Sequence, residues 1–317
     1  MMKKKYLRVV FVGCTSFSKK ILDVALSIKN TQIVGAVTST KTFDISYSEK
    51  PVKNYKHYDL KNYLKKNDIP FEIMRSKVKN NSLLQKFKVW KPDIFLVAGW
   101  YYMIPSKWRT VAPFYGLHAS LLPNYAGGAP LVWALLNNEH KTGITLFKLQ
   151  DGVDDGPIVG QEEVIIDNSE TIKTLYKKIE NKGEILVKRY LPKFFYNSIE
   201  LIEQDKSKRK VYPQRSPKDG KISWENNSSN IERFIRAQTK PYPGAYTMFK
   251  GKPLIIWKAE INNNRYNSKC GQLSFNGENY IIGCKLGSIT LIKINYNGKD
   301  YTKCELKFVF NFKSYNF

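Results

Sequence analysis

Two side chains in this sequence have the types and the setting for proton-transfer chemistry, and they are His118 and Asp154. His118 ends an apolar run and precedes a loop rich in glycine and proline at 119–130. Asp154 follows in a turn between Gly152 and Gly156. A carboxylate beside an imidazole fixes the tautomer of the ring and favours its protonated form. We therefore predict that His118 is a general base and that Asp154 is its partner.

Each motif alone is weak evidence for catalysis. A single histidine beside a loop of this kind more often caps or packs than reacts. The chain has only three histidines, however, and the acidic turn supplies this one with a partner. The two motifs together favour a catalytic pair over a structural histidine.

The elements that precede this pair repeat a strand–helix order typical of a doubly wound α/β sheet. Strands are expected at 7–13, 32–38, 71–74, 93–98 and 115–118, with helices at 17–28, 58–66 and 82–90. Ligands in such sheets bind beyond the carboxyl ends of the strands. Because Gly99 and His118 both follow strands, we predict that the site lies in the crevice at that edge.

The second part of the chain changes character. A strand at 158–166 is expected to lead into a helix ending near residue 190 and a second helix at 191–204. The polar stretch 206–210 is typical of a linker. Beyond it, a helix at 229–237 and short strands separated by turn signals predict a small barrel or sandwich, the strands being 254–257, 280–284, 288–294 and 304–310. We predict two domains, 1–207 and 208–317.

Composition narrows the class of protein. The chain is 42% hydrophobic, which suffices for a globular core, and no apolar run approaches the roughly 20 residues that cross a bilayer. Its four cysteines show no C-x-x-C spacing and no cluster with histidine, so we expect reduced thiols, no metal site and a cytoplasmic location. The net charge of +25 suits an anionic partner such as tRNA. Lysine is nevertheless spread along the whole chain, as in a composition bias.

These motifs resemble those of the 10-formyltetrahydrofolate-dependent formyltransferase family, which includes methionyl-tRNA formyltransferase and sugar nucleotide N-formyltransferases. The resemblance covers most of the chain. It rests on His118-x-Ser120-Leu-Leu-Pro123, Gly128-Ala-Pro130 with Trp133-Ala, Thr142-Gly-Ile-Thr145, Gly152-Val-Asp154-Asp-Gly156 and Tyr242-Pro-Gly-Ala-Tyr246.

The resemblance implies a fold, a reaction and a set of site residues. The fold is a Rossmann-like catalytic domain followed by a β-rich, OB-like barrel. The reaction moves a formyl group from 10-formyltetrahydrofolate, which becomes tetrahydrofolate, to a primary amine, with His118 deprotonating the amine and Asp154 orienting the ring. The cofactor residues would be Gly99, Trp100, Tyr101, Tyr102, Ile104, Ser120, Leu121, Leu122, Pro123, Val153 and Asp155. The substrate residues would be Gly127, Gly128, Ala129 and Pro130.

The chain departs from the family pattern at one position. The family carries Asn-x-His, in which the asparagine amide helps to hold the formyl oxygen as negative charge develops, and the chain has Gly116 instead. A missing donor of this kind costs about 10²–10³ in turnover. We expect a backbone N–H or another side chain to substitute. A catalytically weak folate-binding sensor is the alternative.

The choice of amine follows from two loops. The tRNA-modifying branch carries arginine-rich loops after the second strand and after the S-L-L-P motif, where this chain has 38–48 and 124–127 without arginine. Acceptor stems are held largely through phosphates, so this difference counts against tRNA. Segments 131–133 and 215–219 are more similar to the sugar-modifying branch. We predict a nucleotide-linked amino sugar as acceptor, as in lipopolysaccharide biosynthesis, with methionyl-tRNA as the alternative and with a homodimer left open.

Overall fold

The computed structural model describes residues 5–43, 51–75, 80–262, 269–310 and 314–317. It divides into two compact units, each built from separate stretches of chain. The first unit comprises Met1–Gly127, Thr142–Val164 and Lys177–Tyr212, and the second comprises Gly128–Lys141, Ile165–Tyr176 and Pro213–Phe317. The domain boundary between residues 207 and 208 stays a prediction. In the described residues, no helix is both long and apolar enough to cross a bilayer.

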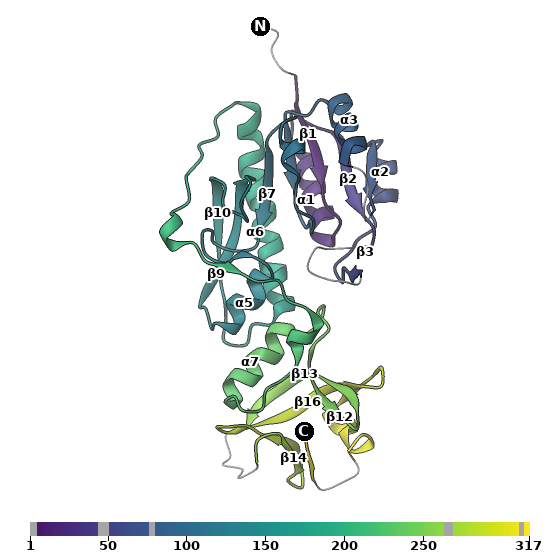
Figure 1. Cartoon of the computed structure of the whole chain (residues 1–317), viewed down its shortest axis with the longest axis vertical. Helices are drawn as coiled ribbons and strands as arrows, with labels where there is room; N and C mark the ends of the chain where they lie inside the picture. The colour runs from purple at the N-terminus through teal and green to yellow at the C-terminus, as the bar shows by residue number, and fades with distance from the viewer. Residues whose placement is uncertain (1–4, 44–50, 76–79, 263–268, 311–313) are drawn as a thin grey trace. The chain divides into compact units, whose positions relative to one another are not determined.

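A seven-stranded sheet forms the centre of the first unit (Figure 1). Its strands are β1 (Leu7–Val12), β2 (Thr31–Ser39), β5 (Phe71–Met74), β6 (Ile94–Val97), β7 (Phe114–His118), β9 (Lys141–Lys148) and β10 (Ile158–Ile165). Their order is β10-β9-β7-β6-β1-β2-β5. The pairs from β5 to β7 are parallel, and β9 is antiparallel to β7. The predicted mostly parallel α/β sheet is confirmed.

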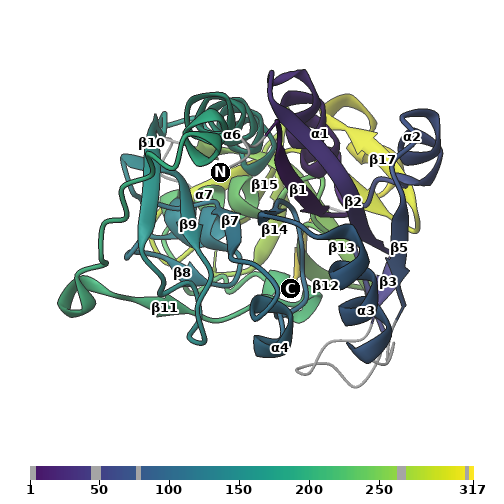
Figure 2. The same ribbon diagram turned by 90° about the horizontal axis from the view of Figure 1, so that it is seen from above.

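Helices cover both faces of this sheet. They are α1 (Ser16–Ser27), α2 (Lys61–Lys66), α3 (Asn80–Trp90), α4 (Ser106–Arg109) and α6 (Ile172–Phe195). Figure 2 shows α1 and α6 on one face, with α3 and α4 on the opposite face. Under α3 and α4 lies an aromatic core in which the rings of Phe95 and Phe114 stack with centroids 3.8 Å apart. Such burial on both faces explains the near-continuous apolar runs of β1 and β6.

The carboxyl ends of β1, β6 and β7 meet at one edge of the sheet. Val97 at the end of β6 is in register with Gly116 of β7, which places His118 at this edge. Beside them, the Cys14 amide donates to the Gly99 carbonyl across 3.3 Å. The strand order reverses between β1 and β6, which is where open α/β sheets bind ligands.

Short elements complete the first unit. They are β3 (Thr42–Phe43), β4 (Val52–Lys53), β8 (Ala126–Gly127), β11 (Val211–Tyr212) and the 3₁₀ turn η1 (Lys206–Lys208). Strands β3 and β4 pair with each other, and β11 pairs in parallel with β8. The predicted loop 38–48 is described only up to residue 43, and the rest of it lies outside the described residues.

The second unit is an antiparallel sheet with two helices. The helices are α5 (Pro130–Leu136) and α7 (Ser228–Gln238), which pack together. The strands are β12 (Ala245–Phe249), β13 (Lys252–Asn262), β14 (Gln272–Phe275), β15 (Tyr280–Gly283), β16 (Ser288–Tyr296), β17 (Lys299–Thr302) and β18 (Ser314–Asn316), and the 3₁₀ turns are η2 (Pro217–Gly220) and η3 (Lys303–Phe308). The sheet order is β12-β13-β16-β15-β14-β18, with β17 on β16. The predicted β-rich second part is confirmed.

Three sequence-based predictions about elements are wrong. The second helix at 191–204 does not form, because α6 continues through Pro192 to Phe195 and the chain beyond is not helical. The strand at 304–310 is the 3₁₀ turn η3, begun by a capping box between Thr302 and Glu305. The linker at 206–210 is part of the first unit, where the backbone of Lys210 bonds to Ala126 and Pro123.

Candidate active site

The His118 imidazole lies between two hydrogen-bond acceptors. Its Nε2 is 2.8 Å from the carbonyl oxygen of Tyr125, and its Nδ1 is 3.4 Å from Oδ2 of Asp154. Because a carbonyl oxygen only accepts, Nε2 donates in the first contact when it carries a proton. The ring also meets Phe147 edge-on, with centroids 6.5 Å apart. The imidazole is therefore held by an acceptor at each nitrogen and by an apolar wall.

Asp154 is presented by a tight turn between β9 and β10. Its backbone adopts a left-handed conformation with φ of +50°, which side-chain-bearing residues rarely take without external support. The Gly127 amide donates to its Oδ2 across 2.8 Å, and that same oxygen faces His118. One carboxylate oxygen thus joins the turn, the loop after β7 and the imidazole.

The segment after His118 is held by buried polar side chains. Thr145 donates to the Ser120 carbonyl across 2.6 Å, and Gln161 donates to the Leu122 carbonyl across 2.8 Å. Ser120 is fully buried, and its hydroxyl donates to the Asn124 carbonyl. Of the predicted cofactor residues here, Ser120 therefore shapes the loop through its hydroxyl.

The apolar residues of the same segment differ in exposure. Leu122 is buried in a small cluster with Phe147 and Ile158, and Leu121 and Pro123 are half-buried. Leu121 lies close over Gly143, where an added Cβ would be 2.4 Å from its side chain. Pro123 follows a cis peptide bond.

The predicted cofactor loop after β6 starts at Gly99, whose φ is +61°. A Cβ at this position would lie 2.1 Å from Oγ1 of Thr15, so only glycine fits this close approach. Trp100 and Tyr102 have ring centroids 5.3 Å apart, while Tyr101 is exposed. Trp100 and Ile104 both pack against the aromatic core under α3.

The remaining predicted residues flank the Asp154 turn and the loop after β7. Val153 is 40% exposed, and Asp155 is half-buried beside Gly152. Gly127 is joined to Asp154 by the hydrogen bond given above. Gly128, Ala129 and Pro130 follow in the chain and belong to the second unit, where Pro130 begins α5 and the left-handed Ala129 precedes it.

Gly116, at the position of the family asparagine, has its missing side chain replaced by Leu149. A Cβ built on Gly116 would be 2.7 Å from Cδ1 of Leu149 and 3.5 Å from Cε1 of Phe147. Leu149 also lines a cavity of about 470 Å³ in the first unit, whose other lining residues are Arg109, Thr110, Ala112, Pro113, Phe114, Lys148 and Gln150. None of the predicted site residues lines this cavity.

Several residues that support the pair carried no signal in the sequence. Tyr125 acts through its carbonyl, so its side chain gives no clue. Gln204 donates from Nε2 to the carbonyls of Asp154 and Gly156 across 2.9 and 2.7 Å, and Arg209 donates to the Val153 carbonyl. These donors lie in a polar stretch whose composition is typical of an exposed linker.

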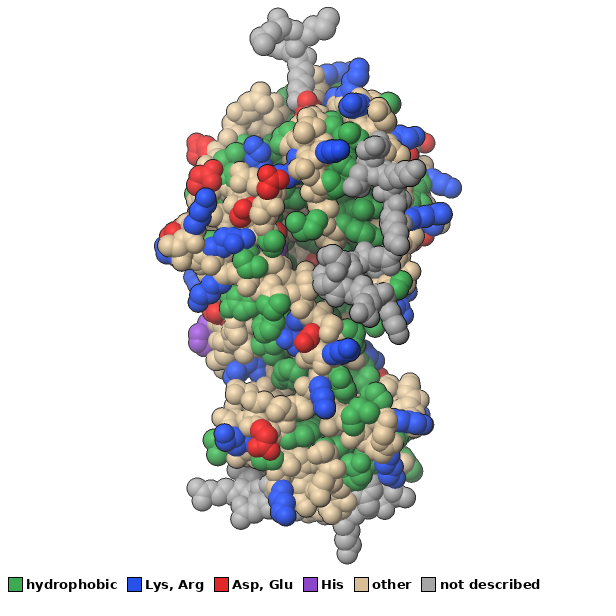
Figure 3. All heavy atoms as spheres, in the orientation of Figure 1, with side chains coloured by type: hydrophobic (Ala, Val, Ile, Leu, Met, Phe, Trp, Pro, Cys, Tyr) green, Lys and Arg blue, Asp and Glu red, His purple; other side chains and the backbone are tan. Residues whose placement is uncertain are grey.

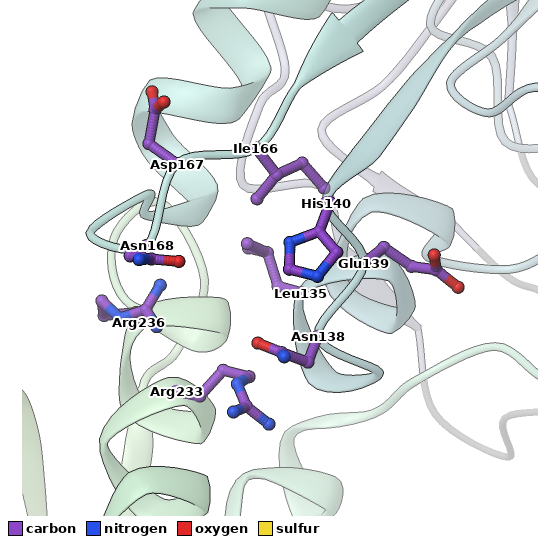
Figure 4. A pocket seen from close by; sticks show the side chains of 9 residues that line it. All are labelled: Leu135, Asn138, Glu139, His140, Ile166, Asp167, Asn168, Arg233 and Arg236. Carbon is purple, nitrogen blue, oxygen red and sulfur yellow. The ribbon is translucent and has the colours of Figure 1, made fainter.

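A separate hollow lies in the second unit, beside the third histidine, His140 (Figure 4). In that view Arg233 and Arg236 extend from α7 toward it, while the carboxylates of Glu139 and Asp167 point away. Arg236 is engaged, because its Nε donates to both oxygens of Glu232. None of the predicted site residues lines this hollow either.

Comparison with known proteins identifies both parts of the chain. A family model described as formyl transferase matches residues 7–191, and one described as formyl transferase, C-terminal domain matches residues 215–306. Bifunctional polymyxin resistance protein ArnA of Wigglesworthia glossinidia brevipalpis is 36% identical over 219 residues, 68% of this chain and 32% of that protein. The chain thus spans about a third of the length of this relative.

Two further proteins are similar along more of their length. Methionyl-tRNA formyltransferase of Caldanaerobacter subterraneus subsp. tengcongensis is 33% identical over 226 residues, 70% of this chain and 72% of that protein. The N-formyltransferase structure from Helicobacter canadensis, in complex with folinic acid and dTDP-3-aminofucose, has a TM-score of 0.64 at 20% identity and covers 95% of this chain and 100% of that chain. That structural likeness shows the shared fold. With both family models matched, the chain belongs to the formyl transferase family.

Proposed function

We propose that this protein transfers a formyl group from 10-formyltetrahydrofolate to the primary amine of a nucleotide-linked amino sugar. The observation that carries the proposal is the His118–Asp154 pair at the carboxyl edge of the sheet, in a chain of the formyl transferase family. The amine must lose a proton as its nitrogen bonds to the formyl carbon. A positioned imidazole is the side chain suited to that transfer near neutral pH.

His118 handles the proton through its two acceptors. With its one proton on Nδ1, beside the Asp154 carboxylate, the neutral ring takes the proton of the amine at Nε2, and the Nε2–H formed in this way faces the Tyr125 carbonyl. Both contacts stabilise the charged ring that proton uptake creates, because each acceptor faces one N–H. His118 then returns the proton to the nitrogen that the formyl group leaves. The pair thereby serves both bond formation and bond cleavage.

The loops predicted to hold the folate have the polar groups that a pterin needs. When bound, the folate supplies an activated formyl group. Among the described residues, Nε1 of Trp100 and Oδ1 of Asp155 are buried polar atoms with no hydrogen-bond partner. One donates and one accepts, and a pterin ring presents both acceptors and N–H groups. Since buried polar groups are normally paired, these two are suited to a ligand in their loops.

We prefer an amino sugar to tRNA as the acceptor because binding a polyanion such as tRNA requires a concentrated basic surface. The loop at 124–127 carries no arginine, and its backbone is committed to β11 and to Asp154. Lys and Arg side chains are scattered over the face shown in Figure 3. The N-formyltransferase from Helicobacter canadensis, whose structure shares the fold of this chain, was determined with a nucleotide-linked amino sugar bound. Methionyl-tRNA is the second candidate acceptor, favoured by the relative that is 33% identical.

The test is a transfer assay with competing acceptors. Purified protein and 10-formyltetrahydrofolate are incubated with a panel of nucleotide-linked amino sugars or with methionyl-tRNA. We expect tetrahydrofolate release and, by mass spectrometry, one formyl group on the sugar amine. Formyl on methionyl-tRNA alone would establish the second candidate. Folate binding without transfer to any acceptor would establish the sensor and overturn the proposal.

A further inference from the structure

One continuous segment, Gln204–Tyr212, contacts both loops that flank the imidazole. We call it the clasp segment. Toward the acidic turn it contributes the two hydrogen bonds of Gln204 and the bond from Arg209 to the Val153 carbonyl. Toward the loop after β7 it contributes β11, which pairs with β8. All of these residues belong to the first unit, so the segment and the catalytic pair are parts of one body.

Gln204 has the chemistry required at its position. It is 8% exposed, and its Nε2 faces two carbonyl oxygens, of Asp154 and Gly156, at 2.9 and 2.7 Å. A group with at least two N–H donors satisfies both, and the glutamine amide supplies them without adding a charge. A glutamate would place an oxygen against two oxygens. The side chain therefore cannot be replaced by its acidic counterpart without losing both bonds.

The Asp154 turn depends on external support. The left-handed backbone of Asp154 is a conformation that aspartate adopts more readily than most residues with a side chain but that still costs free energy, and its neighbours stabilise it here through hydrogen bonds. Gln204 donates to the carbonyl of this residue, while the Gly127 amide donates to its carboxylate, which faces Nδ1 of His118. If the carbonyl is released, the turn can relax and move the carboxylate away from Nδ1.

The other acceptor of the imidazole is held from the same segment. The Ala126 amide donates to the Lys210 carbonyl across 3.0 Å, and the ring of Tyr212 stacks on that of Tyr125 with centroids 4.6 Å apart. Tyr125 also has a left-handed backbone, with φ of +58°. The clasp segment thus sets the spacing between the carbonyl at Nε2 and the carboxylate at Nδ1.

We propose that Gln204 is a positioning residue for the formyl transfer. Through the carbonyls of Asp154 and Gly156 it holds the Asp154 carboxylate against Nδ1 of His118, and so keeps the imidazole ready to take and return a proton. This role rests on the proposed function for its kinetic consequences. Its structural consequence, the geometry at Nδ1, holds whatever the acceptor is.

The test begins with Gln204→Met, which keeps the volume of the side chain and removes its donors. We expect kcat to fall about 100-fold, as for a small misplacement of a catalytic group. KM for the acceptor should change less than about threefold, whereas KM for the folate follows any movement of Val153 and Asp155 in the same turn. In an Asp154→Asn background the same change should cost almost nothing further, because residues that act as a unit are not additive. An equal loss in both backgrounds would overturn the proposal.

A second readout does not need turnover. Nitrogen–proton NMR of the histidine rings, with His118 assigned from the spectrum of His118→Asn, should show the His118 N–H signals shifted in Gln204→Met. They should be unchanged in Gln238→Leu, which alters another buried glutamine in the second unit. If the His118 ring signals of Gln204→Met are identical to those of the unaltered protein, Gln204 is not a positioning residue. This result overturns the proposal even if no acceptor is found. If Gln204→Met does not fold, Gln204→Asn, which keeps the amide but shortens its reach to the two carbonyls, provides the same comparison.

Discussion

At the scale of the residue, His118 differs from a packing histidine in what surrounds its two nitrogens. A structural histidine usually donates from one nitrogen and accepts at the other. Here both partners, the Tyr125 carbonyl and the Asp154 carboxylate, are acceptors. That environment suits a ring that takes up a proton during a reaction.

Removing either member of the pair should stop proton transfer and leave the fold intact. His118→Ala and Asp154→Asn are each expected to lower kcat at least about 100-fold, the usual contribution of a positioned acid–base group. Neither side chain is fully buried, so the melting temperature should change little. Steady-state kinetics and thermal melts measure the two effects. Near-native turnover in either variant would refute the assigned role.

The substitution of glycine for the family asparagine predicts a coupled pair of residues. Gly116→Asn should destabilise the fold by about 1–3 kcal/mol, because its side chain must displace Leu149 from a packed site. Leu149→Ala removes that obstacle. In the double variant the asparagine should cost less than alone, with a coupling of at least about 1 kcal/mol.

The same double variant tests the missing amide donor. If the space of Leu149 is where the family amide acts, Gly116→Asn with Leu149→Ala should turn over at least about tenfold faster than Leu149→Ala alone. Denaturant unfolding gives the stabilities, and the transfer assay gives the rates. Additive stabilities together with equal rates would show that the two positions are independent.

At the scale of the element, the spacing of apolar residues and the turn signals predicted the parallel strands and most helices. Such strands are buried on both faces and such helices on one face, so their apolar residues recur in a regular pattern. These signals failed where the residues at the start of an element determined whether it became a strand, a helix or a loop. Residues 304–310 alternate like a strand, but the capping box of Thr302 and Glu305 starts a 3₁₀ turn. Helix α5 went unpredicted because its start, a left-handed Ala129 followed by Pro130, has the composition of a loop.

The candidate site was predictable in part for a similar reason. His118 and Asp154 carry their chemistry in their side chains, so motifs pointed to them. The supports from Tyr125 and the clasp segment are carbonyls and long-range bonds, and those depend on tertiary structure. Gln204 meets Asp154 across 50 positions of sequence, a pairing that no local pattern encodes.

A partly buried ion cluster joins Lys20 of α1 to Glu180 of α6. Glu180 accepts from Lys20 and from Lys56, each at 2.8 Å. Burial raises the pKa of the Glu180 carboxyl, but the hydrogen bonds and charges of the two lysines outweigh it, so the net pKa is lowered from 4.5. Burial also lowers the pKa of Lys56, and this opposes the effect of Glu180 on it.

This cluster predicts a pH-dependent stability. Because the folded-state pKa of Glu180 is depressed, its contribution is present above about pH 4.5 and is lost as pH falls through the folded-state value. Glu180→Gln should lower the free energy of unfolding by about 2 kcal/mol at pH 7, since it leaves two partly buried lysines without a carboxylate. The difference from the unaltered protein should shrink below pH 4.5. Urea unfolding at several pH values measures it.

The exposed Glu278 provides the matched control. The Glu278 side chain is 81% exposed, and its Oε1 lies 4.0 Å from Nζ of Lys303. Glu278→Gln should therefore change the free energy of unfolding by less than about 0.5 kcal/mol at every pH tested. A Glu180→Gln deficit that grows as the solution is acidified would contradict the assigned sign.

At the scale of the whole molecule, the two units are interleaved along the chain. Residues 128–141 and 165–176 lie between stretches of the first unit in the sequence but belong to the second unit. Helix α5 buries Leu131, Val132, Ala134 and Leu135, and it packs with α7, which lies almost a hundred residues later. Neither half of the chain therefore contains all the residues that its unit requires.

Interleaving predicts that a cut at the sequence-predicted boundary yields no independent domain. A fragment of residues 1–207 would lack α7, exposing the apolar face of α5, and would lack β11, the partner of β8. Exposed apolar patches of this kind drive aggregation, so we expect the fragment to elute as aggregates in size-exclusion chromatography and to bind a hydrophobic dye. Extending it to residue 212 restores β11 and should improve folate binding, while the exposed face of α5 keeps it aggregating. A monomeric, cooperatively melting 1–207 fragment would show that these residues fold without β11 and without α7 packed on α5.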